Sequence, residues 1–195
     1  MRTIPILSTL ALSAAIGSPA VAGSLAGTVQ ATGLRDNGDA VVYIDQIPGT
    51  SFPASDRHEQ VDQRGMVFHP HVSVVLVGTT VDFLNSDALL HNVFSPDKCA
   101  ERFNLGSWPR GEMRSYTFKQ QCAATLLCSV HPEMEAFVVA VPTPYFAVTD
   151  KTGAYAIEDL PDGTYTVKVW HFKLKETSRT LTIAGDAKAD FELKK

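Results

Sequence analysis

Charged residues are scarce in this chain, and long apolar runs are almost absent. Of its 195 residues 19% are charged and 45% are hydrophobic, against about 25% charged in an average soluble domain. This apolar content is enough to build a core, which excludes disorder over most of the length. The formal net charge of −4 gives no general attraction to nucleic acid or anionic lipid, so we expect neither as a partner.

No apolar run reaches the roughly 20 residues that span a bilayer, except near the N-terminus. There Arg2 precedes an apolar stretch at 4–16, and Ala-Val-Ala follows at 20–22. Small residues in this arrangement are what a signal peptidase accepts. We therefore predict a signal peptide over 1–22, export to the periplasm and no membrane span; the alternative is an uncleaved anchor.

Enzyme motifs are also missing. The sequence has no nucleotide-binding loop, no Ser/His/Asp array and no paired carboxylates. We therefore predict that the protein is not an enzyme.

Short β-branched and aromatic runs dominate what is present. They occupy residues 72–77, 81–85, 116–118, 137–141 and 164–170. Turn-forming pairs such as Asn37-Gly38 and Asp162-Gly163 separate many of these runs. Many short strands at this spacing predict an all-β fold of β-sandwiches, and not a parallel sheet with crossover helices.

Two segments carry residues with metal-binding chemistry. Cys128, His131 and Met134 place a thiol, an imidazole and a thioether on one short stretch, and His91 lies far upstream. Soft sulfur ligands with two imidazoles select copper, and a His₂Cys plane with a long axial Met defines a blue-copper site. If Cys128 ends one strand and 136–141 forms the next, one loop can wrap three ligands around one ion. The alternatives are a zinc site, which seldom recruits Met, and a buried Cys with unrelated histidines.

These segments resemble those of cupredoxins, the plastocyanin and amicyanin group of blue copper proteins. The resemblance covers about residues 60–142, and the Cys-x-x-His-x-x-Met loop is similar to the short ligand loop of amicyanin. It implies a cupredoxin Greek-key β-sandwich with one type 1 copper ion per chain. The implied metal ligands are His91, Cys128, His131 and Met134. The resemblance also implies that Asn92 ties the two ligand loops together by hydrogen bonds.

The implied function is to carry single electrons between redox partners. A partner protein would dock near His131 on an apolar patch, for which the candidates are Leu89, Leu90 and Pro132. An apolar shell would tune the potential of the ion, and its candidates are Phe83, Leu126 and Phe137. The alternative function is a periplasmic copper-binding or copper-delivery protein without an electron-transfer role.

Two cysteines, Cys99 and Cys122, are left over once Cys128 is assigned to metal. In an exported protein two such cysteines usually pair, so we predict a disulfide between them. Two histidines, His69 and His71, are predicted to be ordinary strand residues. The alternative is a second, looser copper-loading site that includes them and Met66.

A second resemblance covers residues 145–170. The motifs Gly153-x-Tyr155, Leu160-Pro161 and Gly163-Thr-Tyr165 are similar to the carboxypeptidase regulatory-like, transthyretin-type β-sandwich. This implies a second small β-sandwich built from the N- and C-terminal segments, which would act as an interaction or spacer module. The predicted division is early strands at 23–52, a cupredoxin domain at 53–143 and late strands at 144–195. The alternative is one extended sandwich with extra strands.

Overall fold

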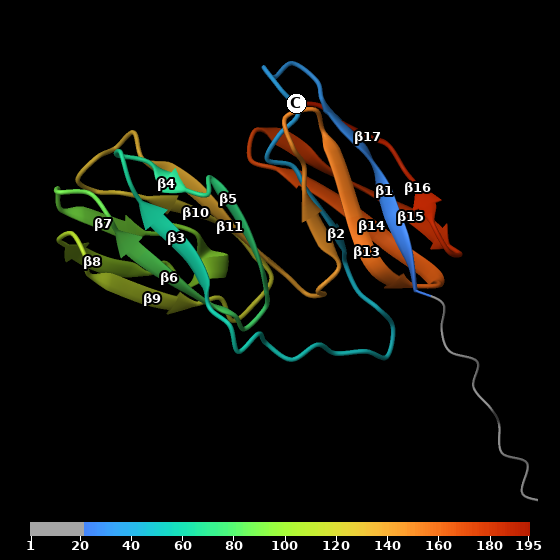
Figure 1. The fold of residues 1–195 in the computed structure, drawn as a ribbon, viewed down its shortest axis with the longest axis horizontal. Helices are drawn as coiled ribbons and strands as arrows, with labels where there is room; N and C mark the ends of the chain where they lie inside the picture. The colour runs from blue at the N-terminus through green and yellow to red at the C-terminus, as the bar shows by residue number, and fades with distance from the viewer. Residues whose placement is uncertain (1–21) are drawn as a thin grey trace, which may run out of the picture.

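The computed structural model describes residues 22–195, and its regular elements are β-strands apart from one short 3₁₀ turn. The predicted signal peptide lies outside the described residues, except for Ala22, where β1 begins. The strands form four sheets that pack in pairs as two β-sandwiches (Figure 1). The predicted all-β fold with two sandwiches is thus confirmed. Within residues 22–195, no helix has the length and apolar character needed to cross a membrane.

The middle of the chain builds one sandwich, which we call the central sandwich. Its two sheets have the strand orders β5-β11-β10-β7-β8 and β4-β3-β6-β9. The first sheet contains β5 (Val72–Leu76), β11 (Glu135–Val141), β10 (Cys122–Leu127), β7 (His91–Phe94) and β8 (Asn104–Trp108). The second contains β4 (Phe68–His69), β3 (Glu59–Gln63), β6 (Thr80–Asn85) and β9 (Met113–Thr117). The pairs β5/β11 and β3/β6 are parallel, and the other pairs are antiparallel.

Both ends of the described chain build the other sandwich, which we call the terminal sandwich. One sheet contains β12 (Phe146–Val148), β2 (Val41–Ile44), β14 (Gly163–His171) and β15 (Leu174–Ile183). The other contains β13 (Ala154–Pro161), β1 (Ala22–Ala31), β16 (Ala187–Lys188) and β17 (Phe191–Leu193). The central sandwich is therefore an insertion between β2 and β12. The residue boundaries at 53 and 144 stay a prediction.

Strands β2 and β11 are apolar at nearly every position because both of their faces are buried. Successive side chains on a strand point to opposite faces. On β11, Ala136, Val138 and Ala140 belong to the central core, whereas Phe137, Val139 and Val141 belong to a cluster between the sandwiches. On β2, Val41 and Tyr43 join this same cluster, while Val42 and Ile44 face the terminal core. The two sandwiches thus share an apolar interface.

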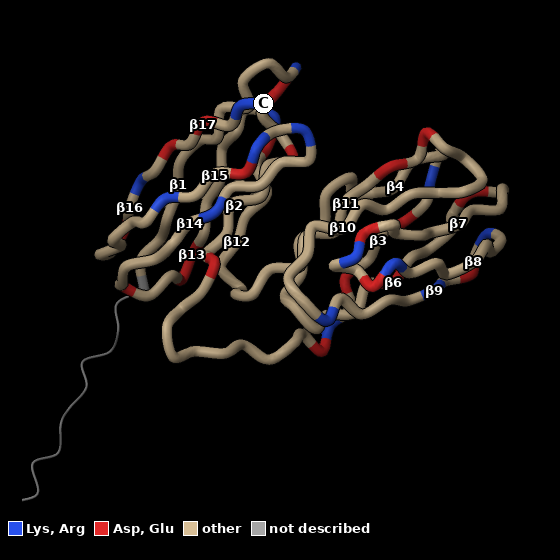
Figure 2. Tube along the Cα trace, turned by 180° about the vertical axis from the view of Figure 1, so that it is seen from behind, with Lys and Arg blue, Asp and Glu red and all other residues tan. Residues whose placement is uncertain are grey.

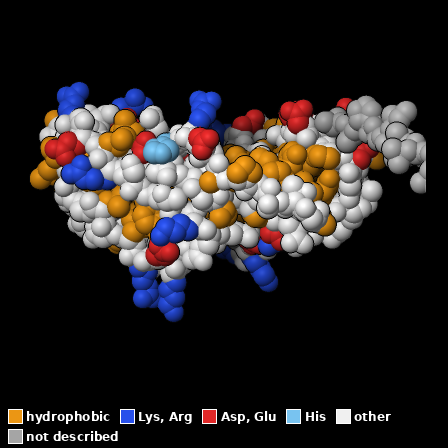
Figure 3. Space-filling view, turned by 90° about the horizontal axis from the view of Figure 1, so that it is seen from below, with side chains coloured by type: hydrophobic (Ala, Val, Ile, Leu, Met, Phe, Trp, Pro, Cys, Tyr) orange, Lys and Arg blue, Asp and Glu red, His pale blue; other side chains and the backbone are white. Residues whose placement is uncertain are grey.

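Basic and acidic residues are both distributed along the chain of each sandwich (Figure 2). Exposed hydrophobic side chains are less evenly spread. Seen from below, they gather on the terminal sandwich beside the interface and occur again at the far end of the central sandwich (Figure 3).

A disulfide ties the 3₁₀ turn η1 (Lys98–Ala100) to the start of β10. It joins Cys99 to Cys122, 23 positions apart in the sequence. The predicted pairing is confirmed, and it leaves Cys128 as the free, buried cysteine of the described chain.

Replacing Cys99 and Cys122 together by serine should lower the free energy of unfolding by about 3 kcal/mol, because the crosslink no longer restricts the unfolded chain. Denaturant unfolding of the metal-free protein measures this loss. The wild-type protein with its disulfide reduced is the control and should show a similar loss. A double variant as stable as the oxidised protein would contradict the prediction.

Candidate metal centre

Three side chains of types that can bind a metal ion converge in the central sandwich. Within residues 22–195, His91, Cys128 and His131 are the group of His, Cys, Asp or Glu side chains whose ligand atoms all lie within 4.8 Å of one another. The Nδ1 atoms of His91 and His131 are 3.0 Å apart, and the Sγ atom of Cys128 is 4.0 Å from Nδ1 of His131. The structure therefore brings three of the four predicted site residues together.

Strand ends position these three side chains. His91 is the first residue of β7, and Cys128 directly follows β10, which pairs with β7. His131 lies in the tight loop from β10 to β11, where its carbonyl accepts a hydrogen bond of 3.0 Å from the N–H of Met134. Two stretches that are distant in sequence thus meet because their strands are neighbours in one sheet.

Met134, the fourth predicted ligand, is fully buried at the end of this loop. Its side chain belongs to the same hydrophobic cluster as Cys128, and Leu126 and Phe83 belong to that cluster too. Two of the three residues predicted for the apolar shell therefore pack in the core beside the site. The axial role of Met134 stays a prediction.

The third predicted shell residue, Phe137, is placed wrongly by the sequence analysis. Its ring lies between the sandwiches and packs against Trp170 and Phe172, with ring centroids 5.7 and 4.8 Å apart. The reason is strand alternation, which turns Phe137 away from the face that carries Ala136 and Val138.

Asn92 joins the two ligand loops, as the resemblance implied. Its backbone N–H lies 3.4 Å from the Sγ atom of Cys128, and its side-chain oxygen accepts a hydrogen bond of 3.2 Å from the N–H of Ser129. Its side-chain amide donates to Oδ1 of Asn104 and to the carbonyl of Gly106, at 2.9 and 2.7 Å. Asn92 therefore links β7 to Cys128 through its backbone, and to the residue after Cys128 and to β8 through its side chain.

Asp87 is a site residue that the sequence analysis did not single out. Its carboxylate accepts hydrogen bonds from Nε2 of the fully buried His91, at 2.8 Å, and from the backbone N–H groups of Gly65 and Met66, at 2.7 and 2.9 Å. The bonds from Met66 and Gly65, with a further contribution from His91, lower the pKa of Asp87 to about 2. The group is therefore ionised and can only accept hydrogen bonds.

This contact fixes the tautomer of His91. The Asp87 carboxylate can only accept a hydrogen bond, so Nε2 of His91 carries the proton and donates it. Nδ1 of His91 therefore keeps its lone pair on the side of Cys128 and His131. The only sequence signal for Asp87 is its position four residues before His91, in a loop with several polar side chains.

Asn85 shapes the loop that carries Asp87. Its side-chain amide donates to the carbonyls of Leu89 and Trp108, both at 2.8 Å, and its Oδ1 accepts from the N–H of Asp87 at 2.9 Å. Trp108 itself is fully buried. Asn85 thus holds the loop before His91 together and links it to Trp108 in the core.

Apolar side chains are exposed on the loops around the cluster. Leu89 and Leu90 are 48% and 54% exposed, and Pro132 is exposed as well, so the predicted patch residues all lie at the surface. Further exposed hydrophobic residues on neighbouring loops are Met66, Val67 and Val130.

His69 and His71 lie outside the cluster. His69 ends β4 and is exposed, whereas Nδ1 of His71 lies 2.6 Å from Oδ2 of Asp39. The ring of His71 packs edge-on against Phe137. Within residues 22–195, three or more His, Cys, Asp or Glu ligand atoms converge in the cluster of His91, Cys128 and His131 alone. That His69 and His71 are ordinary strand residues stays a prediction.

The known proteins to which this chain is similar are found among solved structures. No family model matches the sequence, and no curated protein matches it. A purple cupredoxin from Nitrosopumilus maritimus is 24% identical over 42% of this chain and 98% of its own, with a TM-score of 0.39. A reduced amicyanin variant is 26% identical over 52% of this chain and 98% of its own, with a TM-score of 0.41. A copper-containing nitrite reductase from Thermus scotoductus is 23% identical over 51% of this chain but 25% of its own, with a TM-score of 0.43.

Proposed function

We propose that this chain is a type 1 copper protein that carries single electrons between redox partners. The observation that carries the proposal is the convergence of two imidazoles and one thiol within 4.8 Å, beside an apolar core. This donor set fits copper, because sulfur and imidazole ligands together favour it over hard cations. His91, Cys128 and His131 would hold the ion, together with Met134 as the fourth predicted ligand.

Copper supplies one-electron chemistry, since it is stable as both Cu(I) and Cu(II). The residues of the chain keep the donor atoms in place: Asp87 orients the ring of His91, and Asn92 fixes the loop of Cys128. The N–H of Asn92 also points at the sulfur and stabilises the charge of a thiolate there. Ligands held by packing and hydrogen bonds keep their geometry when the charge of the site changes, which favours electron transfer.

His131 is the proposed point of electron exchange with a partner. It is partly exposed, whereas His91 and Cys128 are buried. The exposed Leu89 and Leu90 lie on a neighbouring loop and give a partner an apolar surface to contact. Transient redox complexes use small interfaces, which such a surface can provide.

Copper delivery without electron transfer is the second candidate function. The observation in its favour is Met66, whose thioether-bearing side chain is exposed while its backbone N–H bonds the same carboxylate that contacts His91. An exposed thioether beside the site offers an incoming or outgoing Cu(I) ion a soft ligand.

The remaining parts of the proposal concern the rest of the chain. We propose export through the signal peptide at 1–22, a cupredoxin domain at 53–143, and no enzymatic activity. The strands at 23–52 and 144–195 would form an interaction or spacer module of the transthyretin type. Its β-sandwich architecture supports this assignment.

Visible absorption with metal analysis tests the proposed function. The oxidised protein should bind one copper ion per chain, show an intense visible band, and lose this band on reduction. A carrier should exchange electrons with a redox partner faster than it passes copper to a chelator, whereas a delivery protein should show the reverse order. A protein that binds no copper when prepared with copper present would refute both functions.

Replacing Met134 by leucine should preserve copper binding and raise the reduction potential. Leucine has a similar volume, so the buried position stays filled, but the thioether that stabilises Cu(II) is lost. Voltammetry of the copper-loaded variant measures the shift. Leu126→Met, a substitution of similar size in the same core, is the control and should change the potential less. An unchanged potential in Met134→Leu would show that Met134 is not the axial ligand.

A further inference from the structure

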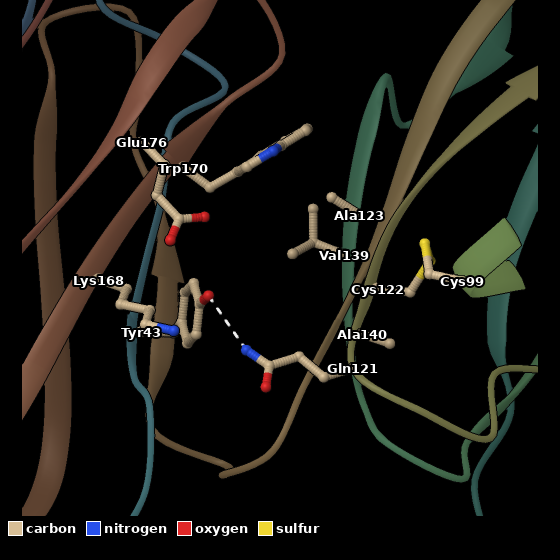
Figure 4. A pocket seen from close by; sticks show the side chains of 10 residues that line it. All are labelled: Tyr43, Cys99, Gln121, Cys122, Ala123, Val139, Ala140, Lys168, Trp170 and Glu176. Carbon is tan, nitrogen blue, oxygen red and sulfur yellow. Dashed lines mark hydrogen bonds between the residues drawn. A yellow bond between two sulfur atoms is a disulfide. The ribbon is translucent and has the colours of Figure 1, made fainter. Parts of the chain in front are cut away.

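A cavity of about 260 Å³ lies between the two sandwiches, apart from the metal centre (Figure 4). The terminal sandwich contributes a wall with polar and aromatic side chains, among them Tyr43, Trp170 and Glu176. The central sandwich contributes an opposite wall that is mostly apolar, with Ala123 and Val139. Junctions between domains are common places for small-molecule sites, and this volume suits a ligand below the usual range of roughly 300–1,000 Å³.

The polar wall has one negative charge in excess. Nζ of Lys168 is paired with Oδ1 of Asp45 at 2.9 Å, so its charge is compensated. Glu176 makes no ion pair with any residue between 22 and 195, and its side chain is exposed. Figure 4 shows its carboxylate on the same side of the cavity as Tyr43 and Trp170. The excess charge favours a cationic ligand.

The hydroxyl of Tyr43 is free to donate a hydrogen bond. It accepts a hydrogen bond of 3.3 Å from Nε2 of Gln121, which reaches across from the central sandwich. Burial and the charge of Glu176 raise the pKa of Tyr43 to about 12, so the phenol stays neutral. A neutral phenol adds polarity to this wall without adding a second negative charge.

The indole of Trp170 supplies the aromatic surface. It projects from β14 toward the apolar wall in Figure 4, and its ring packs at 5.7 Å, tilted by 62°, against Phe137. Tryptophan is the side chain whose ring face attracts organic cations best. A carboxylate, an indole and an apolar wall together match a ligand with a charged head and a short hydrocarbon part.

We propose that this cavity binds a small alkylammonium ion, with its head at Glu176 and Trp170 and its hydrocarbon part against Val139 and Ala123. The site is independent of the metal centre, because none of these residues contributes to the His91, Cys128 and His131 cluster. An anion is disfavoured because Glu176 would repel it while Lys168 is engaged with Asp45. A divalent metal ion is disfavoured because the cavity lacks a cluster of metal-binding side chains.

Titration of the full chain with choline, followed by nuclear magnetic resonance, tests the proposal. Choline should shift the indole N–H signal of Trp170 and leave that of Trp108, which is fully buried in the central core, unchanged. The uncharged carbon isostere of choline, dimethylbutanol, has nearly the same shape and should bind at least tenfold more weakly. Equal binding of the two molecules, or no shift of the Trp170 signal with choline, would overturn the proposal.

A charge-removing variant gives a second measurement. Glu176→Gln keeps the size of an exposed side chain and should weaken choline binding about tenfold, which corresponds to about 1.4 kcal/mol. Glu158→Gln removes one negative charge from β13, outside the cavity, and should leave the affinity unchanged. Equal affinities in both variants would overturn the role of Glu176.

Discussion

The Cys128→Ala variant should lose the intense visible band of the copper-loaded protein completely. The proposed colour depends on the covalent bond between the thiolate and the metal, and Cys128 is the free cysteine of residues 22–195. No other thiol in this range can take its place, because Cys99 and Cys122 are joined in a disulfide. Absorption spectra of equal concentrations of both proteins, loaded with Cu(II), measure the effect.

Two controls separate loss of the ligand from loss of the fold. Cys128 is a small buried side chain, so its truncation should cost about 1 kcal/mol of unfolding free energy and leave the sandwich intact. His69→Ala removes an exposed imidazole outside the cluster and should keep the full band. A Cys128→Ala protein that stays coloured would refute the proposed ligand set.

The architecture was predictable because most strands of a β-sandwich have a recognisable local pattern of apolar residues. Strand β10 alternates buried and partly buried residues along its whole length, as a strand with one face on a core must. Strands β2 and β11 do not alternate, and sequence alone leaves the reason open. Their second face is covered by the other sandwich, which is a tertiary contact that no local pattern encodes.

The same contact explains why Phe137 was assigned to the wrong environment. A phenylalanine close to a ligand loop is a reasonable member of an apolar shell when only one core is considered. Its position on β11, one residue after Ala136, sends its ring to the interface with Trp170. When both faces of a strand are buried, the whole fold decides which face packs against which core.

The convergence of the candidate ligand residues was easier to predict than the contacts that support them. His91, Cys128 and His131 could be found because few residue types bind soft metals, and their spacing fits one loop and one strand end. Asp87 was missed because an aspartate in a polar loop has many roles that sequence cannot distinguish. Its role depends on a tertiary contact, because the backbone N–H groups of Gly65 and Met66 donate hydrogen bonds to its carboxylate.

Asp87→Ala should weaken copper binding by ten- to hundredfold, the range found when the hydrogen-bond partner of a ligating histidine is removed. Without the carboxylate, Nε2 of the fully buried His91 loses its acceptor, and the ring loses the contact that keeps Nδ1 toward Cys128 and His131. Competition with a chelator of known affinity measures the change. The experiment is best performed near neutral pH, where a carboxyl with a pKa of about 2 is fully ionised in the wild type.

Asp87→Asn distinguishes the charge of this side chain from its shape. An asparagine oxygen can still accept hydrogen bonds from Gly65, Met66 or His91, so this variant should lose less affinity than Asp87→Ala. Asp186→Ala is the matched control, because Asp186 accepts a hydrogen bond from Ser24 in the terminal sandwich and has no contact with the cluster. If Asp87→Ala bound copper as tightly as Asp186→Ala, the orientation of His91 would depend on packing alone. The carboxylate would then serve only to hold the turn between β3 and β4.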